Sequence, residues 1–266
     1  MRTADPGEAP AEDAAGGRDF VTALARGLSV MRAFTQQNQD MTLSDVARLV
    51  KLPRATVRRC LLTLETLGYV QSSGHFFRLS PQVLTLAQAY LSSSVLPRVA
   101  QTFLERTSET LDDSCSCSIL HGEEVIYVAR SSRRRMGSLH RDVGTHLPAY
   151  CTSMGRILLA ALPAPELDRF FRTATLRRIT PFTLHREDEL RAALEQVRRD
   201  GYCLVDQELE IDLRGLAVPV HDAAGRVVAA LNVSTQAGRT PKPALLDTYL
   251  PALRQAVSAM RPLLVG

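Results

Sequence analysis

Apolar residues recur every three or four positions in three stretches of the first third of the chain, which predicts three helices. The first is expected over residues 19–34, with a buried stripe formed by Val21, Leu24, Leu28, Met31 and Phe34. The second is expected over residues 43–50, with Thr42 as its N-cap. The third is expected over residues 53–67, because Pro53 suits the first helical position and Gly68 suits a left-handed ending.

Two short strands are predicted next, over residues 69–71 and 76–79. Three helices with a two-residue turn between the second and third, followed by a β-hairpin, are typical of a winged helix-turn-helix. We therefore predict this DNA-binding domain over residues 19–80. Residues 1–18 are rich in Ala, Gly, Asp and Glu and lack the apolar run of a secretory signal, so a disordered tail is expected there.

The remainder of the chain predicts a second domain with helices and an antiparallel sheet. A linker helix is expected over residues 81–94, and a further helix opens the second domain, residues 95–266. Its expected strands are residues 115–119, 125–129, 137–143, 202–206, 214–220 and 227–234, and its later helices begin near residue 153 and cover 187–200 and 243–264. This arrangement is typical of an α+β sensor domain of the GAF or PAS kind, so the fold class as a whole is α+β.

The 266 residues carry a net charge of +4, and its distribution along the chain is uneven. Residues 19–80 hold eight Lys and Arg against four Asp and Glu, and residues 48–59 hold five cations without an acid. A basic block on a small domain indicates a polyanion partner, although a solvated basic helix face has the same composition. Within the predicted helix-turn-helix frame, double-stranded DNA is the expected partner.

The third helix is expected to enter the major groove. Arg58 and Arg59 on its outer face suit bidentate contacts with guanine, whereas Lys51 and Arg54 at its entrance suit phosphates. His75 lies at the tip of the predicted wing. The full set of DNA-binding candidates is Thr42, Ser44, Lys51, Arg54, Ala55, Thr56, Arg58, Arg59 and His75.

No pattern of residues indicates catalysis, a cofactor or a metal. Ser153 lacks the glycine frame of a nucleophile elbow, and Cys151 and His146 have no evident orienting carboxylate. Cys115 and Cys117 have no second cysteine pair for zinc, and an odd total of five cysteines favours reduced thiols in the cytoplasm. No apolar run approaches the roughly 20 residues that span a bilayer. An enzyme tethered to DNA is the alternative that these observations disfavour.

Three N-terminal segments carry a resemblance to a known family. They are MTLSDVA at 41–47, LPRATVRR at 52–59 and LETLGYV at 64–70, and they resemble the DNA-binding domain of the IclR family of bacterial transcription regulators. The similarity continues through VGTHLPAYCTSMGRILLA at 143–160, residues 201–220 and AALNVS at 229–234. With residues 129–130 and 133–134, these look most like the branch that senses aromatic acids and metabolites of the β-ketoadipate pathway.

The resemblance implies a ligand-responsive regulator whose second domain binds a small carboxylate effector and so controls genes of aromatic-acid catabolism. Such a ligand needs hydrogen-bond donors, a helix N-terminus and a partly apolar wall. The candidates are Arg133, Arg134, Tyr150, Thr152, Ser153, Met154, Asn232 and Ser234. Alternatively, Thr152 and Ser153 only cap their helix and Ser234 only ends a strand.

One recognition helix contacts too few base pairs for genomic selectivity, so a homodimer or tetramer reading a pseudo-palindromic operator is expected. The apolar helix over residues 81–91 is the predicted contact seam. The ligand is expected to change either DNA affinity or contact with RNA polymerase. A constitutive repressor whose second domain only oligomerises is the alternative within this class.

Overall fold

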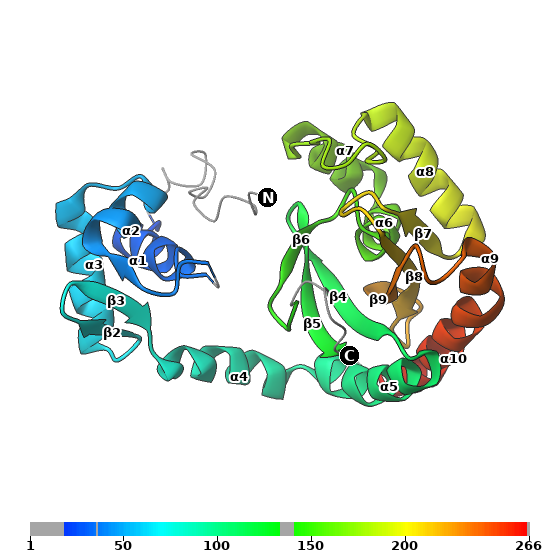
Figure 1. Cartoon of the computed structure of the whole chain (residues 1–266), viewed down its shortest axis with the longest axis horizontal. Helices are drawn as coiled ribbons and strands as arrows, with labels where there is room; N and C mark the ends of the chain where they lie inside the picture. The colour runs from blue at the N-terminus through cyan, green and yellow to red at the C-terminus, as the bar shows by residue number, and fades with distance from the viewer. Residues whose placement is uncertain (1–18, 36, 134–140, 265–266) are drawn as a thin grey trace. The chain divides into compact units, whose positions relative to one another are not determined.

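The computed structural model describes residues 19–35, 37–133 and 141–264. It divides the chain into two compact units, Met1–Tyr90 and Leu91–Gly266, and the boundary falls inside helix α4 (Leu84–Ser93) (Figure 1). The segment in which a disordered tail is predicted, residues 1–18, lies outside the described residues.

The first unit has the helices and the wing of a winged helix-turn-helix. Its elements are α1 (Thr22–Arg32), β1 (Met41–Thr42), α2 (Leu43–Val50), α3 (Arg54–Thr66), β2 (Val70–Ser73) and β3 (Phe76–Leu79). The strands form an antiparallel sheet in the order β1-β3-β2. Its core includes Val30, Val46, Val57, Leu61 and Val70, which come from all three helices and from β2.

Local signals define the turn between α2 and α3. Thr42 caps α2 in a capping box, because its Oγ1 accepts a hydrogen bond from the Asp45 amide at 3.3 Å and its own amide donates to Asp45 Oδ2 at 3.2 Å. Lys51 then ends α2 in a left-handed conformation with φ of 53°. Pro53 is the N-cap of α3, so the helix begins at Arg54, one residue after the predicted first helical position. Gly68, with φ of 82°, follows the end of α3 as predicted.

The predicted apolar stripe of α1 is wrong for its first half. Val21, Leu24 and Leu28 are 61%, 63% and 50% exposed, whereas Val30 and Phe34 are buried. The periodicity identified an apolar helix face correctly, but periodicity does not show whether another part of the same chain covers that face.

Two helices connect the first unit to the sheet of the second. The helical turn Pro81–Val83 leads into α4, which has no buried residue, and α5 (Val95–Leu111) follows after a break at Ser94. Pro97 lies buried within the first turn of α5, where a missing amide is tolerated.

The second unit contains a six-stranded antiparallel sheet in the order β6-β5-β4-β9-β8-β7. The strands are β4 (Ser114–His121), β5 (Glu124–Ser131), β6 (His146–Pro148), β7 (Cys203–Asp206), β8 (Leu213–His221) and β9 (Val227–Gln236). Strands distant in sequence are thereby brought together: Ser116 of β4 pairs with Asn232 of β9, and Gly215 of β8 pairs with Ser234 of β9.

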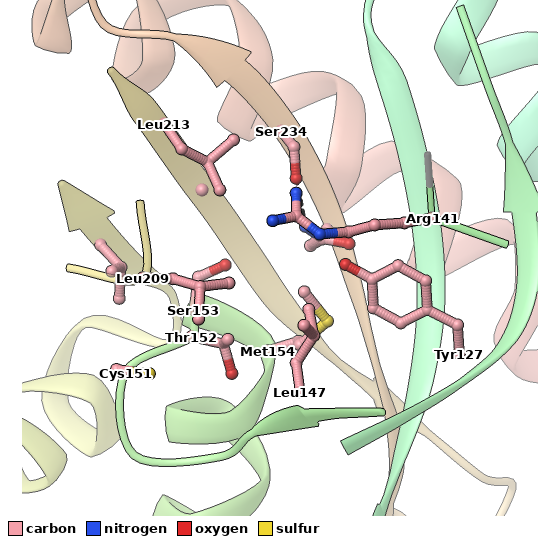
Figure 2. A pocket seen from close by; sticks show the side chains of 13 residues that line it. Tyr127, Arg141, Leu147, Cys151, Thr152, Ser153, Met154, Leu209, Leu213 and Ser234 are labelled. Atoms are coloured by element: carbon pink, nitrogen blue, oxygen red, sulfur yellow. Dashed lines mark hydrogen bonds between the residues drawn. The ribbon is translucent and has the colours of Figure 1, made fainter. Parts of the chain in front are cut away.

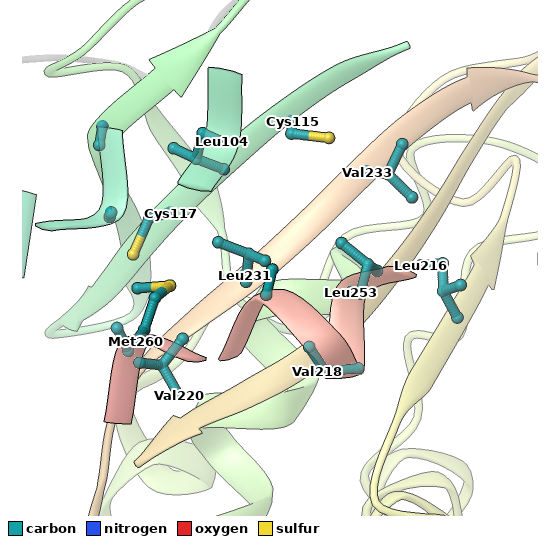
Figure 3. Packing of buried hydrophobic residues seen from close by; sticks show 14 of the residues in the cluster. Leu104, Cys115, Cys117, Leu216, Val218, Val220, Leu231, Val233, Leu253 and Met260 are labelled. Carbon is teal, nitrogen blue, oxygen red and sulfur yellow. The ribbon is translucent and has the colours of Figure 1, made fainter. Parts of the chain in front are cut away.

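Helices cover both faces of this sheet (Figure 1). On one face α5 and α10 (Leu250–Met260) pack against side chains such as Leu216, Leu231 and Val233 (Figure 3). On the other face α6 (Ser153–Ala160), α7 (Ala164–Thr173) and α8 (Glu187–Asp200) enclose a second core. The period-2 alternation of β8 and β9 explains how one pair of strands supplies both cores.

Three features differ from the sequence prediction. Residues 141–143 form no strand, and the rest of the strand predicted over 137–143 lies outside the described residues. Strand β6 and helix α7 were not predicted; β6 has only three residues, too few for a periodic pattern. The predicted closing helix 243–264 consists of α9 (Lys242–Ala244), the π-helical segment η2 (Leu245–Tyr249), α10 and η3 (Arg261–Leu263).

Candidate functional site

The second unit contains a cavity between the start of α6 and the sheet (Figure 2). About 340 Å³ of space inside it is free of protein atoms, open solvent at its mouth included. Its lining residues are Tyr127, Arg141, Leu147, Cys151, Thr152, Ser153, Met154, Val205, Leu209, Leu213, Gly215, Asn232 and Ser234. The lining therefore combines apolar side chains with hydroxyls, one amide and one guanidinium.

The first residues of α6 contribute differently. Thr152 is the N-cap, so its Oγ1 accepts from the Gly155 amide at 3.2 Å and donates to the Pro148 carbonyl at 3.0 Å. Ser153 is 2% exposed, and its Oγ has no hydrogen-bond partner. The two hydroxyls point in different directions in Figure 2. The Thr152 hydroxyl thus serves the fold, whereas the Ser153 hydroxyl is available to a ligand.

Two glycines let the backbone approach closely around Ser153. A Cβ on Gly155 would lie 2.1 Å from the Ala149 carbonyl oxygen, so only glycine permits this packing of α6. A Cβ on Gly215 of β8 would lie 2.8 Å from Ser153 Oγ. Glycine at position 215 therefore leaves the Ser153 side chain room inside the cavity.

Strand β9 supplies a second buried polar side chain, Asn232, that has an atom without a hydrogen-bond partner. Asn232 is buried, its Nδ2 donates to Ser234 Oγ at 3.1 Å, and its Oδ1 has no partner. A buried polar atom without a partner costs free energy, so such atoms are rare in folded proteins. Two of them, Ser153 Oγ and Asn232 Oδ1, on one cavity indicate a binding site for a polar ligand.

Two arginines lie near Tyr127 of β5, and one of them, Arg141, lines the cavity. Arg141 lines the cavity and its Nη2 donates to Glu210 Oε2 at 2.9 Å. Arg130 lies over the Tyr127 ring at 5.6 Å and donates to Ser116 Oγ at 2.7 Å, while its Nε has no partner. Burial lowers the pKa of Arg130 and raises the pKa of Tyr127, which therefore keeps its proton at neutral pH.

The loop between β7 and β8 forms another part of the wall and is anchored by a buried ion pair. Arg156 of α6 donates to both carboxylate oxygens of Glu208 at 2.8 and 2.5 Å, and the Leu184 amide donates to the same carboxylate at 2.9 Å. Both partners are buried. The pair holds this loop, which carries Leu209 and Glu210, against the beginning of α6.

The structure brings five of the eight predicted effector residues to the cavity: Thr152, Ser153, Met154, Asn232 and Ser234. It does not bring Tyr150, whose hydroxyl donates to the Arg177 carbonyl at 2.8 Å, or Arg133, whose Nε donates to the Ser108 carbonyl at 3.4 Å. Arg134 lies outside the described residues.

The sequence prediction missed the cation that does line the cavity, Arg141. It favoured Arg133 and Arg134 instead, of which Arg133 belongs to the described residues and donates to the Ser108 carbonyl. Tyr127 was also missed, although its buried position in the alternating pattern of β5 was a usable signal. Arg141 also lies just before residues 143–160, the segment with the family resemblance, and this position was a second signal for a role in the cavity.

The buried thiol of Cys151 lines the cavity. Burial raises the pKa of its thiol to about 12, so the thiolate is scarce at neutral pH. Cys115 and Cys117 lie in the core on the opposite face of the sheet. In the described part of the chain, no group of three His, Cys, Asp or Glu side chains is arranged to hold a metal ion.

Helix α3 of the first unit presents a basic outer face. Val57, Leu61 and Leu64 are buried, whereas Arg58 and Arg59 are exposed, and neither arginine forms an ion pair among the described residues. The other predicted DNA contacts lie on or next to this face or on the wing. Exposed among them are Ser44, Lys51, Arg54, Ala55 and His75, and partly buried are Thr42 and Thr56.

Comparison with known proteins identifies both units. Residues 23–74 match the IclR helix-turn-helix domain, and residues 88–261 match the bacterial transcriptional regulator IclR C-terminal domain. The chain therefore belongs to the IclR family of bacterial transcriptional regulators. It is 47% identical over 242 residues to the Pca regulon regulatory protein of Pseudomonas putida, an alignment that covers 91% of this chain and 83% of that one.

Two solved structures resemble the fold closely. A putative transcriptional regulator from Rhodococcus sp. RHA1 has a TM-score of 0.81 and 48% identity, over 92% of this chain and 98% of that chain. The inducer-binding domain of a double mutant of the PobR transcription factor from Acinetobacter, in complex with 3-hydroxybenzoic acid, has a TM-score of 0.59 and 34% identity, over 62% of this chain and 97% of that chain. None of the described helices is long and apolar enough to cross a membrane.

Proposed function

We propose that this regulator controls genes for the breakdown of aromatic acids and that its effector is a small carboxylate bound in the cavity beside α6. The observation that carries the proposal is the cavity itself, in which Ser153 Oγ and Asn232 Oδ1 are buried without partners near the guanidinium of Arg141. The Pca and PobR names of the relatives support the same class of ligand.

The chemistry of the lining suits an aromatic acid. A carboxylate needs a cation or several donors, which Arg141 and the Ser153 hydroxyl supply. A ring needs an apolar and polarisable wall, which Leu147, Met154 and Leu209 supply. The start of α6 adds partial positive charge. Among the described residues no catalytic arrangement accompanies these groups, and we propose binding without turnover. Membership of a family of transcriptional regulators supports a location in the cytoplasm, where the DNA lies.

The DNA-binding function follows from α3. We propose that Arg59 and Arg58 contact bases in the major groove, that Lys51 and Arg54 contact phosphates, and that His75 contacts the groove or backbone beside the wing. Thr42, Ser44, Ala55 and Thr56 complete the face, with Thr42 acting also as the cap of α2. The exposed arginines of α3 support this orientation.

We also propose that the protein acts on a pseudo-palindromic operator as a homodimer or a pair of dimers. The first unit exposes six large apolar side chains on two of its helices: Val21, Leu24 and Leu28 at or next to α1, and Leu84, Leu86 and Tyr90 of α4. Val21, Leu24 and Leu28 recur at helical spacing and so share one exposed face, and a contiguous apolar face of this kind marks an interaction site. Sedimentation at micromolar concentration tests the assembly, and a monomer would contradict it.

Calorimetry and DNA binding together test the function. The full-length protein is titrated with benzoate, 3-hydroxybenzoate, 4-hydroxybenzoate and adipate, and operator affinity or transcription from the operator is measured with and without each acid. We expect at least one acid to bind and to change operator affinity or transcription. Operator binding without any response would favour a constitutive repressor, and turnover of an acid would indicate an enzyme. RNA polymerase added to the transcription assay separates repression from activation.

A further inference from the structure

We propose that Arg141 recognises the effector carboxylate and that Glu210 is a built-in competitor, which occupies Arg141 in the free protein and leaves it when the ligand binds. This inference rests on the proposed function, because it assumes that the cavity takes a carboxylate. It adds a residue outside the cavity that sets the affinity, and it assigns the recognition of charge to a single arginine.

Arg141 is the charged residue among those that line the cavity in the described part of the chain. Its guanidinium lies next to Ser234 and the Tyr127 hydroxyl in Figure 2, facing the same space as Ser153. The side chain is 13% exposed. A guanidinium in such a position offers several N–H donors to a ligand and cannot lose its charge.

Glu210 already uses part of that guanidinium. Its Oε2 accepts from Arg141 Nη2 at 2.9 Å, and its side chain is 29% exposed, so it is closer to water than its partner. Two carboxylates on one guanidinium repel each other, and the repulsion is strongest where water is scarce. Binding of the ligand carboxylate therefore weakens the contact between Glu210 and Arg141. Glu210 is the partner that can be released into water at low cost, because its side chain is partly exposed.

The loop that carries Glu210 is built for such a local exchange. One side of it is anchored at Glu208 by Arg156 and the Leu184 amide, and these bonds do not involve the cavity. Both Gln207 and Asp212, at the two ends of the loop, have left-handed backbones, with φ of 61° and 65°. Loss of the Arg141 contact frees the side chain of Glu210 while Glu208 keeps the loop in place.

A second arginine strengthens the preference for an added anion. Arg130 is partly buried and lies near Arg141. Burial is the main cause that lowers the pKa of Arg130, and the positive charge of Arg141 lowers it further. Among the residues that the structure describes, Glu210 pairs with Arg141 and with no other cation. Asp142 offsets part of the charge of Arg130, and a ligand carboxylate adds to that compensation, so Glu210 reduces but does not abolish the attraction for an acid.

The test uses full-length protein and calorimetry with the tightest of the four acids named above. Glu210→Gln removes the competing charge and keeps the side-chain volume, so we expect roughly three- to tenfold tighter binding. Arg141→Gln should weaken binding at least about tenfold. In the double variant the gain from Glu210→Gln should disappear. Glu187→Gln, which removes an exposed carboxylate paired with Arg191 on α8, is the control for net charge.

A neutral ligand separates competition from a general change in the cavity. The amide of the same acid carries no charge, so Glu210→Gln should leave its affinity unchanged. Unchanged operator affinity of each variant in the absence of ligand shows that it is folded.

The outcomes distinguish this inference from the function on which it rests. If no acid binds the wild type or the variants, the proposed function fails and the competition falls with it. If the acid binds the wild type but Glu210→Gln binds it equally or more weakly, Glu210 orients Arg141 and the competition is refuted, while the proposed function stands. Unchanged binding by Arg141→Gln would place the carboxylate elsewhere.

Discussion

Replacing Ser153 by Ala should move stability and effector affinity in opposite directions. Ser153 Oγ is buried and has no hydrogen-bond partner in the free protein, although it faces the cavity. The substitution therefore removes a cost from the free protein and a donor from the complex. A residue that serves only the fold would show the opposite sign in stability.

The magnitudes follow from the two environments. An unpaired buried hydroxyl costs about 1–3 kcal/mol, so Ser153→Ala should raise the free energy of unfolding by about 1 kcal/mol and Tm by roughly 2–4 °C. In the complex the same hydroxyl donates to a charged group, and losing that bond costs about 1.5–3 kcal/mol, or roughly 10- to 150-fold in affinity.

Thr152→Ala is the matched control. Its hydroxyl caps α6 through the Gly155 amide and bonds to Pro148, so its loss should lower the free energy of unfolding by about 1 kcal/mol. Thermal unfolding measures stability, and calorimetry with a benzoate-class acid measures affinity. If Ser153→Ala lowers Tm as Thr152→Ala does, or binds the acid with unchanged affinity, the assignment of Ser153 to the ligand is refuted.

Three further predictions concern the helix of the first unit, the buried ion pair and the thiols. Arg59→Ala should weaken specific operator binding by about 1–3 kcal/mol and relax base preference, whereas Lys51→Ala should weaken all DNA binding and reduce its salt dependence by about one phosphate contact. Fluorescence anisotropy at several salt concentrations checks both variants. Intact sequence discrimination in Arg59→Ala would contradict the assignment of Arg59 to a base. Arg156→Met leaves Glu208 buried without its partner and should lower the free energy of unfolding, measured by urea titration, by about 3–5 kcal/mol. The double variant that also carries Glu208→Leu should recover this stability. A small effect of the single change would show that Glu208 is not desolvated. Iodoacetamide at pH 8 should modify Cys60 first, because Cys60 is only partly buried, whereas burial raises the pKa of Cys115, Cys117, Cys151 and Cys203 to about 12. Peptide mapping identifies the labelled thiol. Labelling of Cys151 first would contradict its burial.

The sequence by itself determined those features whose signals are local. The capping box at Thr42, the glycine after α3 and the apolar spacing of α3 act within one or two helical turns, so α2, α3 and the exposure of Arg58 and Arg59 were predictable. The start of α6 at Ser153 was predictable for the same reason, with Thr152 as its cap.

Tertiary structure alone decided which side chains meet in the cavity. Arg141 and Glu210 are 69 positions apart, and Ser153 faces Gly215 only because α6 packs on β8. It also decided that the Ser153 hydroxyl is free for a ligand while the Tyr150 hydroxyl is not. Local propensity specifies where an element begins and which face is apolar. The partner of each face depends on long-range packing, which has no signature in the spacing of neighbouring residues.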